Sequence, residues 1–137
     1  MPNWRDELIE AVKTKAEREA EEAARHKKRV EEALTTAEAA MVLAAEALRF
    51  ARGQLVEKGQ TAELTEARDG YRIAFREFGL SVDLVRESAI IKVGFLDGKP
   101  REFDFAKDRH IAPADVEEYV GRRAVELVKA AQKAAPW

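Results

Sequence analysis

The amino-acid sequence predicts an α+β fold with a long N-terminal helix of the coiled-coil or bundle-forming type, a second helix, a small antiparallel β-sheet of two or three strands, and a C-terminal helix. Three observations support this prediction. The residues between Pro2 and Gly53 include neither proline nor glycine and are mostly strong helix formers. The hydrophobic period becomes two after about residue 80 and helical again after Pro113. We expect a helical arm and bundle segment over 1–59 and a small α+β domain over 60–137, packed on the helix.

The first helix is expected to begin after Asn3, whose side chain can cap it, with Asp6 and Glu7 in the first turn. A single helix of this length would extend roughly 75 Å, which exceeds the width of a compact domain of this mass. The helix must therefore project, bend or pair with another chain.

A heptad pattern runs through the second half of this helix. Apolar residues follow the four-three spacing without a miss, with large residues at one core position and mostly alanine at the other, at Val30, Leu34, Ala37, Met41, Ala44, Leu48, Ala51 and Leu55. Neighbouring positions such as Val42 and Leu43 are also apolar, and we expect Phe50 to reach the aromatic core of the second half. More apolar surface is present than the rest of the chain would cover, so the pattern predicts that these eight residues form an oligomer interface.

Gly59 is a plausible left-handed stop, after which a second helix is predicted from about Ala62 to Phe78, capped by Thr61 and ended by Gly79. On that helix Arg68, Arg72 and Arg76 would be spaced by four residues and share one face. Three aligned guanidinium groups could contact a nucleic-acid backbone or an acidic partner. Interleaved acids, Glu66, Asp69 and Glu77, explain the same pattern as an intramolecular salt-bridge face.

Alternation predicts the strands. Ile91, Val93 and Phe95 share a face of one strand, and Arg101, Phe103 and Phe105 alternate with acids on another, with a hairpin turn at Asp97-Gly98. Residues 80–87 alternate too and form either a third strand or a short helix capped by Ser81. The last helix is expected to start at Pro113 or at Asp115.

Composition limits the function classes. Lys and Arg number 24 against 26 Asp and Glu, so net charge neither demands nor excludes nucleic acid. There is no cysteine, which removes disulfides and thiol chemistry. The first residues are too acidic for a secretory signal, and no apolar run is long enough to span a bilayer, so we expect a soluble, cytoplasmic protein with no membrane association.

No motif indicates catalysis, a metal or a cofactor, and we expect none of the three. The histidines are His26, within a basic run from Arg25 to Arg29 that is more typical of a solvated helix face than of a phosphate contact, and His110. An enzyme using His110 as a general base beside Asp104 or Asp108 is the weakest of the hypotheses.

The favoured hypothesis is an oligomeric structural or adaptor protein that acts through helix–helix association, with another copy or a helical protein as its partner. The alternative is a nucleic-acid-binding module that uses the three arginines. High Ala, Glu and Lys content and the agreement of propensity with pattern are typical of designed proteins as well as natural ones.

Overall fold

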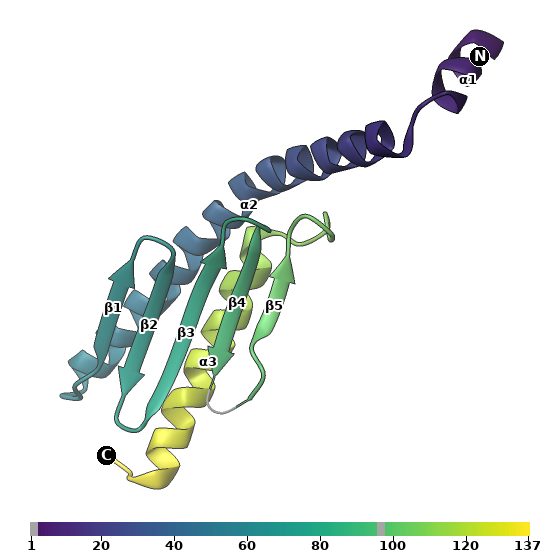
Figure 1. Cartoon of the computed structure of the whole chain (residues 1–137). Helices are drawn as coiled ribbons and strands as arrows, with labels where there is room; N and C mark the ends of the chain where they lie inside the picture. The colour runs from purple at the N-terminus through teal and green to yellow at the C-terminus, as the bar shows by residue number, and fades with distance from the viewer. Residues whose placement is uncertain (1–2, 96–97) are drawn as a thin grey trace.

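The computed structural model describes residues 3–95 and 98–137 and has the expected α+β class. A long helix enters a domain made of one antiparallel sheet with two helices on one of its faces (Figure 1). The elements are α1 (Trp4–Ala11), α2 (Lys15–Glu57), β1 (Glu63–Ala67), β2 (Gly70–Phe75), β3 (Phe78–Val85), β4 (Ile90–Phe95), β5 (Arg101–Asp104) and α3 (Pro113–Ala134).

The N-terminal helix is interrupted once. Asn3 caps α1 as predicted, since its Oδ1 accepts a hydrogen bond from the Asp6 amide. The expected continuous helix is wrong at residues 12–14, where Thr14 leaves the helical conformation and caps α2 by accepting from the Glu17 amide. Threonine caps a helix as readily as it sits in one, so an N-cap can interrupt a sequence that lacks proline and glycine. Gly59, with φ of 77°, follows α2 in the left-handed conformation as predicted.

The predicted second helix over 62–78 is wrong, because this segment forms β1 and β2. Leu64 pairs with Ile73, and Ala67 pairs with Gly70, so the two strands make a tight hairpin. Tyr71 and Phe75 fit a helical face as well as a period of two, whereas Ile73 fits only the period of two, and sheet pairing selects the strand. The signal that distinguishes the two is Asp69-Gly70, a typical hairpin-turn dipeptide.

The sheet has five strands in the order β1-β2-β3-β4-β5, not two or three. All neighbours are antiparallel, so the sheet is a simple meander. The strand alternative for 80–87 is confirmed by β3, and the alternation of residues 91–95 and 101–103 is confirmed by β4 and β5. The predicted turn at Asp97-Gly98 includes Asp97, which lies outside the described residues.

One face of the sheet packs on α2 and α3, which lie behind it in Figure 1 and run side by side in the same direction. α3 starts at Pro113, one of the two predicted positions, while Asp115 Oδ2 accepts from the Ala112 amide and completes the N-terminal cap. No helix of the described residues covers the other face of the sheet, which carries mostly small or polar residues, among them Gly70, Gly79 and Ser81.

The heptad pattern lies inside this chain. Ala37, Ala44 and Leu48 are completely buried, and all eight positions belong to the hydrophobic core or pack against it. Their cover is the sheet together with α3, whose Val116, Val120 and Leu127 are in the same cluster. Five strands hide more apolar area than the two or three expected from the sequence. The surface that was expected to form an oligomer interface is therefore occupied in the folded chain, and a contact between chains has to use other residues.

Candidate interaction surfaces

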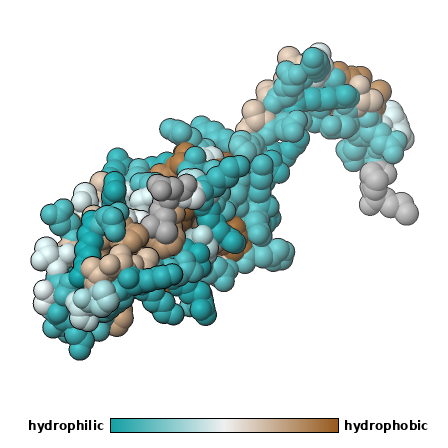
Figure 2. All heavy atoms as spheres, turned by 90° about the horizontal axis from the view of Figure 1, so that it is seen from below, coloured by the Kyte–Doolittle hydropathy of each residue, from teal (hydrophilic) through white to brown (hydrophobic). Residues whose placement is uncertain are grey.

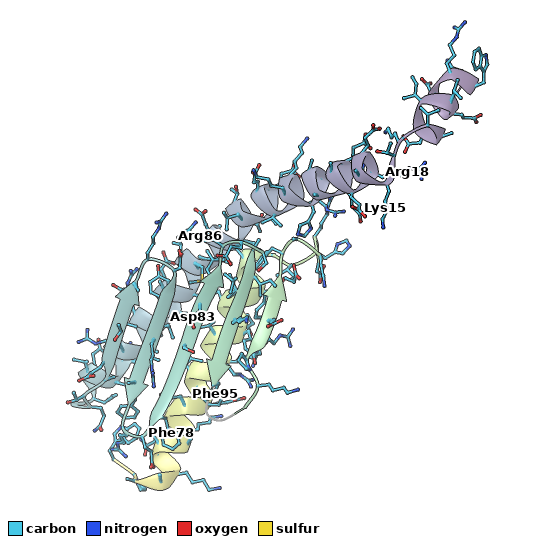
Figure 3. The ribbon with its side chains drawn as sticks, in the orientation of Figure 1. Lys15, Arg18, Phe78, Asp83, Arg86 and Phe95 are labelled. Carbon is cyan, nitrogen blue, oxygen red and sulfur yellow. The ribbon has the colours of Figure 1, made fainter. Side chains whose placement is uncertain are left out.

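The arm, defined as residues 3–29, is a helical extension that projects from the domain (Figure 1). Every arm residue is exposed except Lys13 and Glu21, which are half-buried, and burial begins abruptly at Val30. The α2 part of the arm is polar on all sides apart from alanines, which is typical of a helix that bridges solvent. Figure 3 shows the side chains of this part, including Lys15 and Arg18, spread around the helix into solvent. The arm therefore holds α1 away from the domain.

A polar corner joins α1 to α2. Lys13 Nζ donates to the Glu10 carboxylate at 2.7 Å and contacts the Glu21 carboxylate at 2.9 Å, and Arg18 donates to the Glu10 carbonyl at 3.2 Å. The hydrogen bond from Lys13 holds the pKa of the Glu10 carboxyl below its ordinary value. The hydrogen bonds to Glu10 and Glu21 in turn raise the pKa of Lys13. These contacts set the direction in which α1 leaves α2.

The tip, defined as α1 with Val12, carries apolar side chains that nothing in the described chain covers. Trp4, Leu8, Ile9 and Val12 are between 53% and 68% exposed. Trp4, Leu8 and Val12 are spaced by four residues and form one stripe, while Asp6, Glu7 and Glu10 make the rest of the tip acidic. Figure 2 shows hydrophobic residues near the far end of the arm, separated from the domain by mostly hydrophilic ones. An eight-residue helix of this kind is marginal in water without a partner.

The second surface is the α2/α3 groove, an open apolar channel on the side of the two helices that faces away from the sheet. The residues at the contact between α2 and α3 are small, namely Ala47, Ala51 and Gly121, so the larger side chains on either side leave a groove between them. The volume of this groove is about 570 Å³. Phe50 and Val125 stand at its sides and are 70% and 52% exposed. The expectation that Phe50 reaches the core is therefore wrong. The only charged side chains that line the groove among the described residues are Lys58 and Lys129.

The three arginines predicted to form a ladder do not lie together. Arg68 lies in the β1–β2 turn, Arg72 on the uncovered face of β2, and Arg76 in the β2–β3 turn. Four strand residues extend about 13 Å, more than twice the separation of four helical residues, so the groups cannot grip one phosphate together. The prediction that the three arginines share a helical face is wrong because the segment is a hairpin.

Arg76 instead holds the C-terminal segment. Its guanidinium donates to the carbonyls of Ala131 and Ala135 and to Gln60 Oε1, and it lies 4.5 Å from the centre of the Trp137 ring. Trp137 packs edge-on against Phe75. Arg76 has a φ of 56°, an uncommon conformation for a residue with a side chain. These contacts give Arg76 a structural role at the end of α3.

A third surface is the basic junction, where the arm meets the β5–α3 loop. His26 and Arg29 on α2 line one pocket with Lys107, Arg109 and His110 of the loop. Arg29, Lys107 and Arg109 have no ion pair with an acid in the described part of the chain. Asp108 and, in the adjoining pocket, Glu32 are the neighbouring acids. The two histidines, 84 positions apart in the sequence, thus come together with three cations, which the sequence alone did not indicate.

The carboxylates near His110 are engaged in the backbone of the loop. Asp104 Oδ1 accepts from the amides of Ala106 and Lys107, and Asp108 Oδ1 accepts from the amide of His110. These bonds shape the loop and involve no imidazole nitrogen, so they do not assemble the acid–base pair of the enzyme hypothesis. Within residues 3–95 and 98–137, no three His, Cys, Asp or Glu side chains are grouped as a metal site would require.

The uncovered face of the sheet holds one perturbed group. Asp83, labelled at the middle of β3 in Figure 3, lies beside Gly70 on the neighbouring strand, where a Cβ would come within 2.5 Å of its Oδ1. Burial raises the pKa of the Asp83 carboxyl. Gly70 is thus favoured by the close approach of the Asp83 carboxylate. A single carboxylate on a flat face of small residues does not form a site.

Comparison of the chain with protein-family models, curated proteins and solved structures finds no match. In the described part of the chain, none of the helices combines the length and the apolar character needed to cross a membrane. The candidate surfaces of this protein are therefore the tip, the α2/α3 groove and the basic junction, each defined by the geometry of this chain.

Proposed function

We propose that this protein is a self-associating structural or adaptor subunit that uses its helical arm to contact a neighbouring copy. One observation carries the proposal: an apolar tip is held out from the domain by a polar helix continuous with the core. A buried half of α2 fixes the direction of the exposed half, so the tip is presented at a defined distance rather than on a loose linker.

The polar half of the arm supports this role through its length. From Lys15 to Val30 the helix rises about 22 Å, which is enough to separate two domains while the tip reaches beyond them. Its alanines and charged pairs, such as Lys15 with Glu19, favour a helix without tertiary contacts. A rigid helical spacer with an apolar end can connect two copies of the domain.

Sedimentation velocity across a concentration series tests the proposal. We expect the full chain to form a defined oligomer at tens of micromolar. Replacing Trp4 and Leu8 by serine should return it to the monomer, because the change removes the largest apolar side chains of the tip. Both positions are exposed, so the domain should keep its unfolding midpoint. A full-length protein that stays strictly monomeric over this range would contradict the proposal.

The basic junction favours a second candidate function, contact with the phosphate backbone of a nucleic acid. Arg29, Lys107 and Arg109 line one pocket and have no ion pair with an acid among the described residues. We therefore place nucleic-acid contact at the basic junction and not at Arg68, Arg72 and Arg76.

Fluorescence anisotropy with a labelled duplex and a labelled single strand, in low salt, tests this second function. Arg29→Ala with Arg109→Ala should abolish binding, whereas Arg122→Ala, an exposed arginine of α3 paired with Glu118, is the matched control. Absence of any salt-dependent binding by the unchanged chain would exclude it.

A further inference from the structure

We propose that the α2/α3 groove of one copy receives the tip of a second copy, and that two chains exchange tips reciprocally. This inference rests on the proposed function and names the surface on which the arm docks. It starts from two unmatched apolar surfaces in one molecule, the stripe of Trp4, Leu8 and Val12 and the groove beside Phe50 and Val125.

A chain cannot fill its own groove. The tip joins α2 through residues 12–14 only, and the groove begins at Ala47, 32 residues further along one unbroken helix. That separation is about 48 Å of rigid helix, which three linking residues cannot fold back across. The tip that occupies the groove must therefore come from another molecule.

Charge makes the tip and the groove complementary. The tip carries Asp6 and Glu7, together with Glu10, which is paired with Lys13, against a single base, Arg5. Among the described residues, the charged side chains that line the groove are Lys58 and Lys129, while Glu46 and Glu117 lie in the adjoining pocket beside Phe50, so the acidic side of the tip should face the lysines. Opposite charges beside an apolar contact orient the partners and disfavour wrong registers. A tip meeting another tip would bring like charges together.

A two-fold arrangement lets each copy both give a tip and receive one. Two antiparallel copies of α2 would each direct their arm toward the other's domain, and the contact would be self-complementary.

If each covered apolar side chain loses on the order of 100 Å² of accessible surface, two exchanged tips and grooves bury roughly 1,200 Å² or more. This area is at the lower end of the range for specific protein–protein interfaces.

Two variants, each altered on one side of the contact, test the exchange by sedimentation velocity. The tip variant is Trp4→Ser with Leu8→Ser, which keeps the charges of the tip. The groove variant is Phe50→Glu with Val125→Glu, both exposed positions. Each variant alone should shift the dimer midpoint by more than about tenfold. Val56→Glu is the matched control, because Val56 is a similarly exposed apolar residue of α2 that does not line the groove.

Mixing the two variants gives the decisive readout. The tip variant retains an intact groove and the groove variant retains an intact tip. The mixture should therefore form a 1:1 heterodimer held by one tip-in-groove contact, whereas neither variant alone can form such a contact. Melting curves confirm that both domains remain folded. If the tip variant is monomeric while the groove variant dimerises like the unchanged chain, arm-mediated association holds but the groove assignment is overturned. If the unchanged chain is itself monomeric, the exchange and the proposed function both fail.

Discussion

The arm and the buried half of α2 belong to one helix and differ almost completely in their surroundings. Residues 15–29 are exposed to solvent apart from the half-buried Glu21, whereas Ala37, Ala44 and Leu48 a few turns later have no accessible surface. Both halves are rich in Ala, Glu, Lys and Arg, so helix propensity is similar along the whole element. The comparison shows that propensity makes the helix and that the apolar pattern decides which part of it joins the core.

The largest test of this contrast is a pair of leucine truncations. Leu48→Ala should lower the free energy of unfolding by about 3 kcal/mol, because it leaves a cavity in a fully buried site. Leu8→Ala, the same change in the exposed tip, should leave the unfolding free energy of the domain unchanged. Chemical denaturation of the monomeric protein at low concentration measures both. Equal effects at the two sites would contradict the division of the chain into core and arm.

Glycine substitutions sharpen the comparison at the level of the backbone. Ala44→Gly should cost about 2 kcal/mol of global stability, from lost helix propensity and a lost buried methyl group. Ala20→Gly should cost about 1 kcal/mol locally, because it loses only propensity. Hydrogen exchange should then show faster exchange within the arm and no change in the domain. A lower global midpoint for Ala20→Gly would indicate that the arm is part of the cooperative unit.

A smaller effect is expected where the sheet is tied to the buried half of α2. Arg86 Nε donates to Asp69 at 2.7 Å, and Arg86 Nη1 donates to Glu38 of α2 at 3.1 Å. The hydrogen bond to Asp69 raises the pKa of Arg86, so it stays charged. Arg86→Met should lower the denaturation midpoint slightly, because ion pairs between partly exposed groups contribute little to stability. Lys15→Met, which removes the arm pair with Glu19, is the control and should be neutral by the same denaturation measurement.

The smallest effect is one of pH, and its sign differs between the two regions. In the arm, the pKa of Glu10 is lowered, so the corner is stabilised above the ordinary glutamate pKa and loses this stabilisation as pH falls through the lowered value. In the domain, the pKa of Asp83 is raised. The contribution of this carboxyl to stability is therefore fully present at low pH and is lost as pH rises through the raised value. NMR of the Lys13 and Asp83 amides during acid titration should follow the two transitions. Asp83→Asn should remove the second transition alone.

Much of the fold could be predicted from local pattern. The cap at Asn3, the stop at Gly59, the strands around Ile91 and Phe103, and the helix from Pro113 all follow from short-range chemistry that tertiary contacts do not override. The prediction was wrong where one pattern fits two structures. Tyr71 and Phe75 satisfy both periods, and the hairpin is chosen by pairing with β3, which no local window contains.

The interaction surfaces could be predicted only in part. The heptad pattern indicates apolar contacts, and in the folded chain these residues contact its own sheet and α3. The spacing alone does not distinguish such cover from a second chain, because the size of the sheet depends on the β1–β2 hairpin. The α2/α3 groove and the basic junction depend on long-range packing of α3 and the β5–α3 loop, which no spacing within one segment encodes. Phe50 carried no signal that separates a core residue from a groove residue.

The continuity of α2 across Val30 has a mechanical consequence. Without a joint between its exposed and buried halves, the helix behaves as a lever whose fulcrum is the rim of the domain. A load on the tip is then delivered as torque to the layer of side chains between α2 and the sheet, so that anything pulling on the arm pulls on the core as well.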